Sequence, residues 1–471
     1  MKTVLPRQAM LNVIALTALA LLFPVHQAWA SAAERLAASL RIETISYQDR
    51  AQINYEAFQQ FNDYLARTYP GVFRELEVEV VNGYSLLIRW PGSDPSLKPI
   101  LFTAHTDVVP VEPGTEAGWT HPPFDGVIAD GRIYGRGTLD DKAGVLSLLE
   151  AAEQLLAEGY APRRGIVLAF GHDEEISGLE GAAALAARMQ ALGLRFEWMV
   201  DEGGMIFADN PLLPERPVAM VNVAEKGYLT LTLVATGEGG HSSNPPKVST
   251  IGRLSNALAL IEANPFDPRL VGPVEAMFET LAPHVGQPQR LVFDNLWLTG
   301  PLVAKRMAEE RLTLPFVRTT TALTMFNAGV KENVVPQRAE ARVNFRLLPG
   351  DTPEMVVSYI TDLIDDPAVE ITYNRWENIP PISDHEGPGF QVISDAIGEV
   401  YPEAVVTPSL LTATTDTRHY TELADDLYRF HGILMSARQA SSIHGADEYI
   451  AVDSYEKSIA VARAMMRLGS E

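Results

Sequence analysis

Five short motifs of the chain contain aspartate or glutamate, three of them together with histidine, and these are the residue types that bind divalent metal ions and transfer protons. They are "AHTD", "LDDK", "HDEE", "VDEG" and "IHGADE", and they lie far apart along the 471 residues. Two imidazoles and three carboxylates, one of them bridging, are a donor set that suits a pair of zinc ions. The candidate metal ligands are His105, Asp140, Glu175, Asp201 and His444.

Each motif taken singly also has an ordinary structural explanation. A histidine near a strand end is more often a surface or core residue than a ligand. One acid of the Asp140-Asp141 pair is explained as a helix N-cap. Adjacent acids such as Glu174 and Glu175 are tolerated on a turn that faces water. The prediction of a metal centre therefore depends on all five segments meeting at one place.

The elements predicted around the motifs explain how such distant segments could meet. Short apolar strands are predicted just before His105, before Glu174 and up to Asp201, and helices are predicted at residues 142–158 and 181–192. Open α/β sheets form their ligand sites at the carboxyl ends of strands. The alternation therefore predicts an α/β fold, with a mixed sheet flanked by helices and most of the candidate ligands at one edge.

Other segments outline the rest of the chain. Residues 34–69 have apolar residues at helical spacing, and residues 76–90 read as a hairpin. From residue 226 the order becomes βαββαβ, typical of a ferredoxin-like four-stranded sheet. Residues 265–316 are rich in proline and irregular. The predicted divisions are a signal peptide at 1–30, a catalytic domain at 31–225 and 376–471, and a lid or dimerisation domain at 226–375.

The first thirty residues have the features of a secretory signal. Lys2 and Arg7 precede an apolar stretch of about 17 residues, and the small residues Ala28 and Ala30 then form a cleavage site. The alternative is an uncleaved membrane anchor, but the stretch is at the short end of what spans a bilayer. We expect a periplasmic or secreted protein with no stable membrane span after cleavage.

Composition excludes several classes of protein. With 60 acidic and 37 basic residues, the net charge of −23 opposes binding to a phosphate backbone, so nucleic acid is not an expected partner. The chain has no cysteine, so it forms no disulfide and carries no lipidated cysteine. A hydrophobic content of 46% is ordinary for a globular protein.

In their order, the motifs resemble those of the co-catalytic di-zinc aminoacylase and carboxypeptidase family, which includes glutamate carboxypeptidase and succinyl-diaminopimelate desuccinylase. Further matching stretches are "GHSSNPP", "ENVVPQ", "FRLLPGDT" and "TDTRHY", so the resemblance covers nearly the whole chain after the leader. The segments "GRGTLDDKAG" and "HDEEISG" make the resemblance strongest to the carboxypeptidase S branch. That branch also contains secreted hydrolases of N-fatty-acyl amino acids.

The resemblance assigns the ligands to two zinc ions per subunit. It implies that His105 and Asp201 bind one ion and that Glu175 and His444 bind the other. Asp140 would bridge the two ions, and the peptide bond that follows it would be cis.

The resemblance also assigns the catalytic groups. Glu174 would take a proton from a water acidified by the zinc ions and pass it to the leaving amine. Asp107 would orient the imidazole of His105. His241, in "GHSSNPP", would stabilise the oxyanion, and in dimeric relatives the matching histidine enters the partner's active site. A homodimer through the lid domain is therefore an expected assembly.

A substrate with a free α-carboxylate requires a cation in the site. Arg346, in "FRLLPGDT", matches the family's carboxylate-binding arginine, with Asn333 near it. Arg418, in "TDTRHY", is a second candidate, and an ordinary salt bridge is its alternative explanation. Many relatives have glycine before the Thr-Asp pair of that motif, where this chain has Thr414. Threonine resists backbone angles that glycine tolerates, so this departure bears on the pocket wall.

The sequence thus predicts an exported zinc metallopeptidase that cleaves the amide bond N-terminal to a free amino acid in short peptides. The alternative substrate is an N-fatty-acyl amino acid, for which residues 291–303, with Trp297, could line an acyl pocket. A more remote alternative is a periplasmic solute-binding protein, which would not need Glu174. A metal-free scaffold is another, but all five ligand-type residues are intact.

Overall fold

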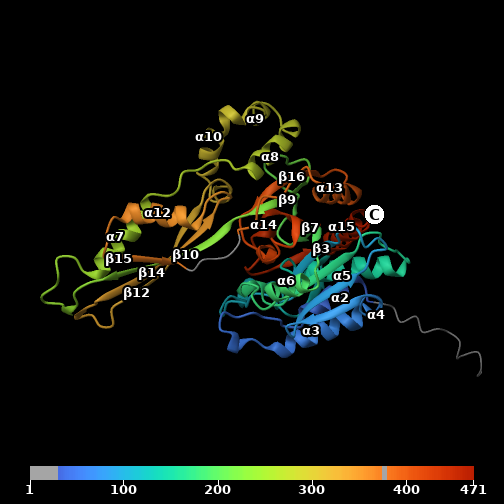
Figure 1. The fold of residues 1–471 in the computed structure, drawn as a ribbon, viewed down its shortest axis with the longest axis horizontal. Helices are drawn as coiled ribbons and strands as arrows, with labels where there is room; N and C mark the ends of the chain where they lie inside the picture. Colours follow the sequence, from blue (N-terminus) through green and yellow to red (C-terminus); the bar gives the residue numbers. More distant parts are fainter. Residues whose placement is uncertain (1–29, 374–378) are drawn as a thin grey trace, which may run out of the picture.

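The main element of the protein is a ten-stranded mixed sheet, seen in a computed structural model that describes residues 30–373 and 379–471 (Figure 1). All but the last residue of the predicted signal peptide lies outside the described residues. The strands in spatial order are β1 (Glu77–Val81), β2 (Ser85–Trp90), β6 (Ile166–Gly171), β3 (Ile100–His105), β7 (Phe196–Asp201), β17 (Ala424–Arg429), β9 (Val218–Glu225), β8 (Ile206–Phe207) and β18 (Leu434–Met435), and β16 (Val405–Leu411) also pairs with β9.

Four neighbouring strands, β6, β3, β7 and β17, run parallel to one another. Their carboxyl ends therefore lie at one edge of the sheet, which is where an open α/β sheet places its ligands. His105 ends β3, and Asp201 ends β7. The predicted α/β fold with a mixed sheet is confirmed.

Helices cover both faces of the large sheet because its strands are apolar on both sides. Successive strand residues point to opposite faces, so Leu86 and Ile88 belong to one core cluster and Leu87 belongs to another. One face carries α2 (Ala32–Leu40), α3 (Tyr55–Thr68), α4 (Pro70–Glu75), α5 (Lys142–Ala157), α13 (Pro388–Val400) and α15 (Val452–Gly469). The other face carries α6 (Ala182–Ala191).

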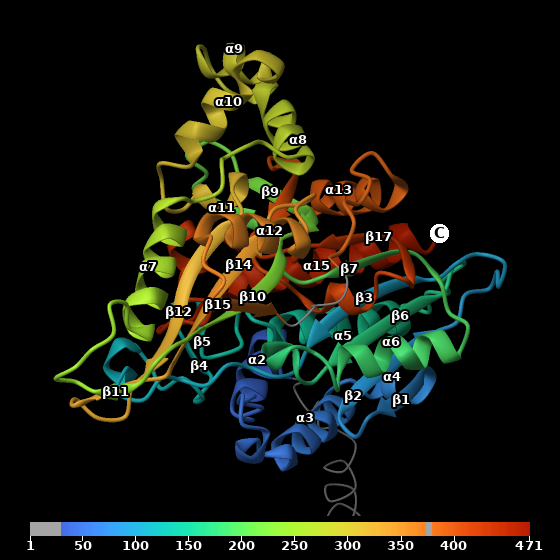
Figure 2. The same ribbon diagram turned by 60° about the vertical axis from the view of Figure 1, so that its left-hand side comes forward.

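A second, antiparallel sheet projects from the first (Figure 1). Its strands are, in spatial order, β12 (Thr320–Ala328), β14 (Arg338–Leu347), β10 (Gly227–Thr236) and β15 (Val369–Tyr373), and its helices are α7 (Thr250–Ala263) and α12 (Pro353–Ile364). Alternate residues of β10, such as Leu229 and Leu231, are buried against these helices. The structure thus has the predicted βαββαβ order. The short pair β11 (Gly240–His241) and β13 (Val334–Val335) lies at the tip of this projection (Figure 2).

The prediction of one helix over residues 34–69 is wrong. The structure has α2 and α3 with an extended segment between them, in which Ile45 forms a bridge with Val108. The backbone N–H of Val108 donates to the carbonyl of Thr44 at 2.9 Å, and that of Ser46 donates to the carbonyl of Val108 at 3.1 Å. This pairing with the segment after β3 overrides the helical spacing.

The prediction that residues 265–316 are irregular is also wrong. They contain α8 (Gly272–Leu281), α9 (Gln289–Phe293), α10 (Leu296–Met307) and the start of α11 (Leu314–Val317). Pro273 and Pro315 lie in the first turns of α8 and α11, where the missing N–H would have no helical partner in any case. These two prolines therefore mark helix starts, whereas Pro301 lies inside α10.

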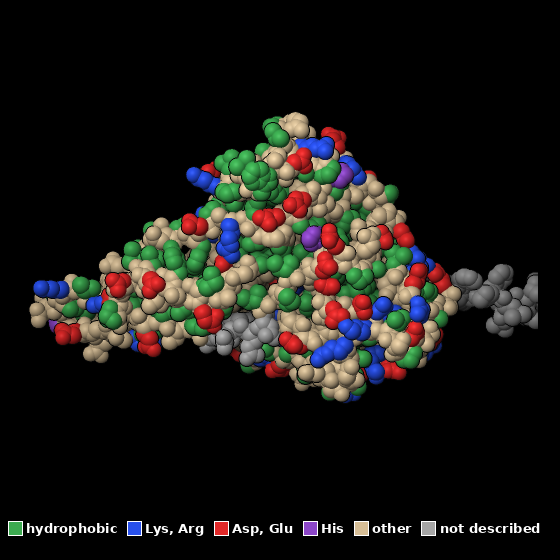
Figure 3. Space-filling model, turned by 45° about the horizontal axis from the view of Figure 1, so that its top comes forward, with side chains coloured by type: hydrophobic (Ala, Val, Ile, Leu, Met, Phe, Trp, Pro, Cys, Tyr) green, Lys and Arg blue, Asp and Glu red, His purple; other side chains and the backbone are tan. Residues whose placement is uncertain are grey.

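Helix α8 packs against β9 and β16 of the large sheet, and α9 and α10 extend that cluster. On the outer side of α10, Trp297 is 80% exposed and Leu302 is 70% exposed. The acyl pocket suggested for residues 291–303 stays a prediction. Figure 3 shows hydrophobic side chains gathered where these helices lie. Within residues 30–373 and 379–471, none of the helices has the length and apolar character to cross a membrane.

Lys226 joins the two sheets, between β9 and β10, and is fully buried. Its Nζ donates to the carbonyls of Pro315 at 3.0 Å and Arg318 at 2.7 Å. Burial and the charge of Arg346 lower the pKa of Lys226 to about 7. Two carbonyls match the two N–H groups of a neutral amine.

We expect this lysine to make the protein more stable as the pH rises from 7 to 10. In that range an unfolded lysine keeps its proton while Lys226 in the folded protein has lost it, so the unfolding free energy rises by up to about 1.4 kcal/mol per pH unit. Urea unfolding of Lys226→Met should show a smaller rise than wild type, whereas Lys247→Met, at an exposed lysine, should match wild type. Parallel profiles for wild type and Lys226→Met would contradict this.

Candidate metal centre and active site

Asp140 lies between two imidazoles. Its Oδ1 is 2.8 Å from Nε2 of His105, and its Oδ2 is 3.0 Å from Nε2 of His444. Glu175 Oε2 lies 3.1 Å from the same nitrogen of His444. Ligand atoms of His105, Asp140 and Glu175 lie within 4.8 Å of one another. Each oxygen of this carboxylate faces a different imidazole. This is the placement that a carboxylate needs in order to bridge two cations.

The loops that carry Asp140 and His444 are joined by hydrogen bonds and an ion pair. The buried carboxylate of Glu448 accepts hydrogen bonds from the backbone N–H groups of Gly137 at 3.1 Å and Leu139 at 2.7 Å, and it forms an ion pair with Arg136 at 2.6 Å. Beside this contact, β5 (Arg132–Tyr134) pairs with β19 (Tyr449–Ala451). The peptide bond that follows Asp140 is cis, as the resemblance implied.

Asp107 holds both His105 and the turn that carries the two glutamates. Nδ1 of His105 lies 3.0 Å from the backbone oxygen of Asp107 and 3.3 Å from its Oδ1. The carboxylate of Asp107 accepts hydrogen bonds from the backbone N–H groups of Glu174 at 3.1 Å and Glu175 at 3.2 Å. With Nδ1 directed at these oxygens, Nε2 of His105 is directed at Asp140 and is the nitrogen that could hold a metal ion.

A second group of potential ligands consists of His105, Glu174 and Glu202, whose ligand atoms also lie within 4.8 Å of one another. Asp201 belongs to neither group. Sequence reasoning missed Glu202, although it follows β7 directly, whereas Glu174 comes three residues after the end of β6. Asp201 is the last residue of β7, and Glu202 is the first residue after it.

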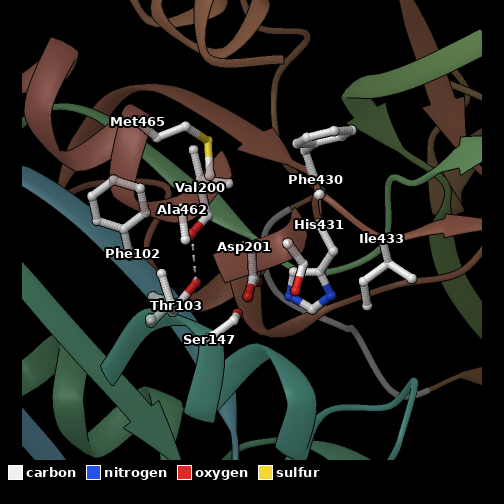
Figure 4. Close-up of a pocket in the computed structure, with 13 residues that line it drawn as sticks. Phe102, Thr103, Ser147, Val200, Asp201, Phe430, His431, Ile433, Ala462 and Met465 are labelled. Carbon is white, nitrogen blue, oxygen red and sulfur yellow. Dashed lines mark hydrogen bonds between the residues drawn. The ribbon is translucent and has the colours of Figure 1, made fainter. Parts of the chain in front are cut away.

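Asp201 faces the interior behind this site. Its Oδ2 accepts a hydrogen bond from Oγ1 of Thr417 at 2.7 Å. Together with His431 it lines a cavity of about 20 Å³, a volume on the scale of one water molecule (Figure 4). Burial lowers the pKa of His431 to about 4, so this imidazole is neutral near pH 7. The role of Asp201 as a metal ligand stays a prediction.

The electrostatics of the site favour added positive charge. Burial and the neighbouring Asp140 raise the pKa of Glu175 to about 7. Burial also raises the pKa of Glu202, and the charge of Asp140 adds to the effect. Hydrogen bonds to Asp140 and Glu175 raise the pKa of His444 to about 10. Oε1 of Glu175 is buried with no hydrogen-bond partner among the described residues. Nitrogen and carboxylate donors in such a setting fit divalent metal ions.

Of the predicted substrate residues, the two arginines lie near this site. Arg346 is on β14, and its Nη1 donates to Oγ1 of Thr414 at 3.2 Å. Arg418 donates from Nη2 to the carbonyl of Ser177 at 2.9 Å, next to the turn that carries Glu174. Arg418 thus supports that turn.

His241 and Asn333 lie elsewhere, at the tip of the smaller sheet. His241 is in β11, Asn333 precedes β13, and the N–H of Ser242 donates to the carbonyl of Asn333 at 3.2 Å. Both side chains are exposed. Within one chain, the structure brings these two residues together but does not bring them to Asp140.

A parallel sheet edge that gathers imidazoles around a bridging carboxylate, with a further glutamate beside them, defines a metal-dependent hydrolase. The chain belongs to peptidase family M20/M25/M40, whose family model matches residues 101–468. This membership confirms the resemblance seen in the motifs and disfavours both the solute-binding protein and the metal-free scaffold.

Two curated relatives illustrate the similarity. The chain is 41% identical over 433 residues to the N-fatty-acyl-amino acid synthase/hydrolase PM20D1 of Bos taurus, covering 90% of this chain and 85% of that protein. It is 31% identical over 483 residues to carboxypeptidase S of Saccharomyces cerevisiae, covering 91% and 82%. An M20 family metallo-carboxypeptidase from Sulfolobus solfataricus has the same fold, with a TM-score of 0.69 at 21% identity over 93% of this chain and 99% of that one.

Proposed function

We propose that this protein hydrolyses the amide bond N-terminal to a free amino acid in short peptides, with two zinc ions per subunit. The observation that carries the proposal is Asp140 between the imidazoles of His105 and His444, with Glu174 beside them. N-fatty-acyl amino acids are the second candidate substrates. The observation that favours them is the 41% identity to a relative named for that activity.

The proposed ligand set follows the geometry of the two groups. Asp140 would be shared by the two positions, Glu175 and His444 would complete one of them, and His105 with Glu202 would complete the other. Glu202 here takes the place that the resemblance gave to Asp201. Bound divalent ions at these positions would acidify a water molecule and polarise the amide carbonyl.

The proposal gives three residues of the chain separate roles in the reaction. Glu174 accepts the proton of the attacking water and returns it to the leaving amine, and the raised pKa that burial gives it suits both transfers. Asp107 fixes the positions of Glu174 and His105 relative to each other, because its carboxylate contacts Glu174 and its backbone oxygen contacts His105. Arg346 binds the free carboxylate of the substrate.

We propose the domain division stated above, with residues 226–375 as a lid that also forms a homodimer. Strand β12 is an edge strand, and Leu323, Met325 and Phe326 on it are 39–49% exposed. Pairing between copies would cover this edge and would let His241 reach the site of the partner. A monomeric mass by light scattering at micromolar concentration would contradict the dimer.

We also propose that the leader at residues 1–30 directs export to the periplasm or the medium, with cleavage after Ala30. The basic residues before its apolar stretch and the small residues at its end support this. N-terminal sequencing of the exported protein should begin at Ser31. A retained Met1 would support the membrane-anchor alternative.

The proposed activity is tested by zinc analysis coupled to a substrate panel. We expect hydrolysis of dipeptides or N-acyl amino acids with a free carboxylate, and hydrolysis at least tenfold slower of the matching carboxamides, because Arg346 then lacks its anion. A chelator should abolish the activity and added zinc should restore it. Activity that survives complete metal removal would refute the proposal. Activity on dipeptides with none on long-chain N-acyl amino acids would remove the second candidate.

A further inference from the structure

A pocket lies at the start of β12, between the end of α7 and α11. Its volume is about 320 Å³, which is at the lower end of the range for small-molecule sites. It is lined by Ile261 and Glu262 on α7, Pro265 after this helix, Leu314 on α11 and Thr321 on β12, among others. None of these five residues belongs to the candidate metal centre.

This pocket lies on the side of the smaller sheet that α7 covers. Thr321 on β12 pairs with Phe345 on β14, and residues directly opposite each other in an antiparallel pair point to the same face. Phe345 belongs to the core that this sheet shares with α7 and α12. Arg346 is the next residue along β14, so it points to the other face. The sheet thus separates the pocket from the arginine proposed to bind the substrate.

Two residues of opposite charge line the pocket, Glu262 and Arg318. Among residues 30–373 and 379–471, neither of them forms an ion pair, and Nε of Arg318 is buried with no hydrogen-bond partner. The nearby Arg269, by contrast, is paired with Asp351 at 2.8 Å. Buried polar groups are nearly always hydrogen-bonded, so the guanidinium of Arg318 calls for a ligand that accepts its hydrogen bonds.

The segment that carries Arg318 is held in place by its backbone. The carbonyls of Pro315 and Arg318 accept hydrogen bonds from Nζ of Lys226, and the carbonyl of Val317 accepts one from the N–H of Arg269 at 2.8 Å. None of these bonds uses the side chain of Arg318. A ligand can therefore bind the guanidinium without breaking them, and little ordering of the segment is needed when it binds.

The chemistry of the lining selects a ligand that has both charges and an apolar body. The guanidinium of Arg318 matches a carboxylate, and the carboxylate of Glu262 matches an ammonium group. The side chains of Ile261, Pro265 and Leu314 offer apolar contacts to the rest of the ligand. An amino acid carries both charges at neutral pH. A fatty acid would leave Glu262 without a partner and would place two carboxylates in one pocket.

We propose that this pocket is a second binding site, separate from the metal centre, for a free amino acid with a large apolar side chain. Arg318 donates to the α-carboxylate of the ligand, and Glu262 accepts from its α-ammonium group. The inference goes beyond the proposed function, because binding at this site does not require that the protein is a hydrolase.

The test is calorimetry of the zinc-loaded protein with phenylalanine. Arg318→Met should weaken binding about tenfold, since hydrogen bonds to a charged group are lost. Glu262→Gln should weaken it about threefold, because Glu262 is exposed and water screens its charge. Arg311→Met and Glu279→Gln, at exposed residues outside the pocket, are the matched controls and should bind as wild type.

Two analogues without an amide bond assign each charge. 3-Phenylpropanoate lacks the ammonium group, so its binding should be insensitive to Glu262→Gln and should fall with Arg318→Met. Phenethylamine lacks the carboxylate, so the reverse should hold. Hydrolysis by both variants, measured without added amino acid, should keep kcat and KM within about twofold of wild type, because neither residue lies at the metal centre.

Equal binding of phenylalanine by wild type, Arg318→Met and Glu262→Gln would overturn the inference, because the ligand would then bind elsewhere. Absence of binding to wild type at about 10 mM phenylalanine would also overturn it. If Arg318→Met does not fold, Glu262→Gln decides the question, since it changes an exposed side chain. A protein that hydrolyses no substrate but binds phenylalanine through Arg318 and Glu262 would refute the proposed function and support this site.

Discussion

Replacement of Glu174 by glutamine should lower kcat about a thousandfold while the protein keeps its full zinc content. The amide of glutamine cannot take a proton from water, and general base catalysis by a positioned side chain contributes roughly 10² to 10⁴ in rate. The contacts that hold the turn use the backbone N–H groups of residues 174 and 175, so the substitution leaves them in place. Steady-state kinetics with metal analysis of the same sample measures both quantities.

The matched control is Glu180→Gln, which changes an exposed glutamate six residues along the chain that pairs with Arg50. Its kcat should stay within about twofold of wild type. If Glu174→Gln keeps more than a tenth of the wild-type rate, Glu174 is not the base. If it loses zinc in proportion to activity, Glu174 acts as a ligand instead, a role that its place in a group with His105 and Glu202 would permit.

Glu448→Gln should lower the free energy of unfolding by about 3–5 kcal/mol. The substitution leaves the guanidinium of Arg136 buried without its ion pair, and an unpaired buried charge costs about this much. It also weakens the acceptor for the N–H groups of Gly137 and Leu139, so the loop that carries Asp140 should hold zinc less tightly. Urea unfolding and zinc competition with a chelator measure the two effects.

An exposed ion pair provides the control for this prediction. Glu310→Gln removes one of the two acidic partners of Arg306 on the surface, and it should cost less than about 1 kcal/mol. Replacement of both Arg136 and Glu448 by methionine should recover part of the stability lost in Glu448→Gln, because no buried charge is then left alone. A decrease of less than about 1 kcal/mol in the unfolding free energy of Glu448→Gln would show that the contacts of Glu448 with Arg136 and the loop are not needed for stability.

The part of the site that the sequence predicts well is the part that local patterns determine. Apolar strands that end at polar motifs identify the edge of the sheet, and the turn of Asn82 and Gly83, both with positive φ, joins β1 and β2 as predicted. His105, Asp140, Glu175 and His444 meet as the resemblance implied. These residues stand at strand ends or in loops whose place follows from strand order.

The place of Glu202 beside the predicted ligand Asp201 could not be predicted in the same way. The two residues are adjacent, and which of them reaches the metal group depends on which side of β7 its end presents, a property of the whole sheet. The break between α2 and α3 likewise depends on a partner, Val108, that is distant in sequence. The places of His241 and Asn333 depend on how far the smaller sheet extends from the larger one.

Strand β17 lies between β7 and β9 in the large sheet, although it comes about 200 residues after them in the sequence. During synthesis, the edges of β7 and β9 therefore stay unpaired until the smaller sheet and β17 have been made. His444 and Glu448 follow later still. A nascent or prematurely terminated chain thus has exposed strand edges and only part of the ligand set, so metal capture belongs to the last stage of folding.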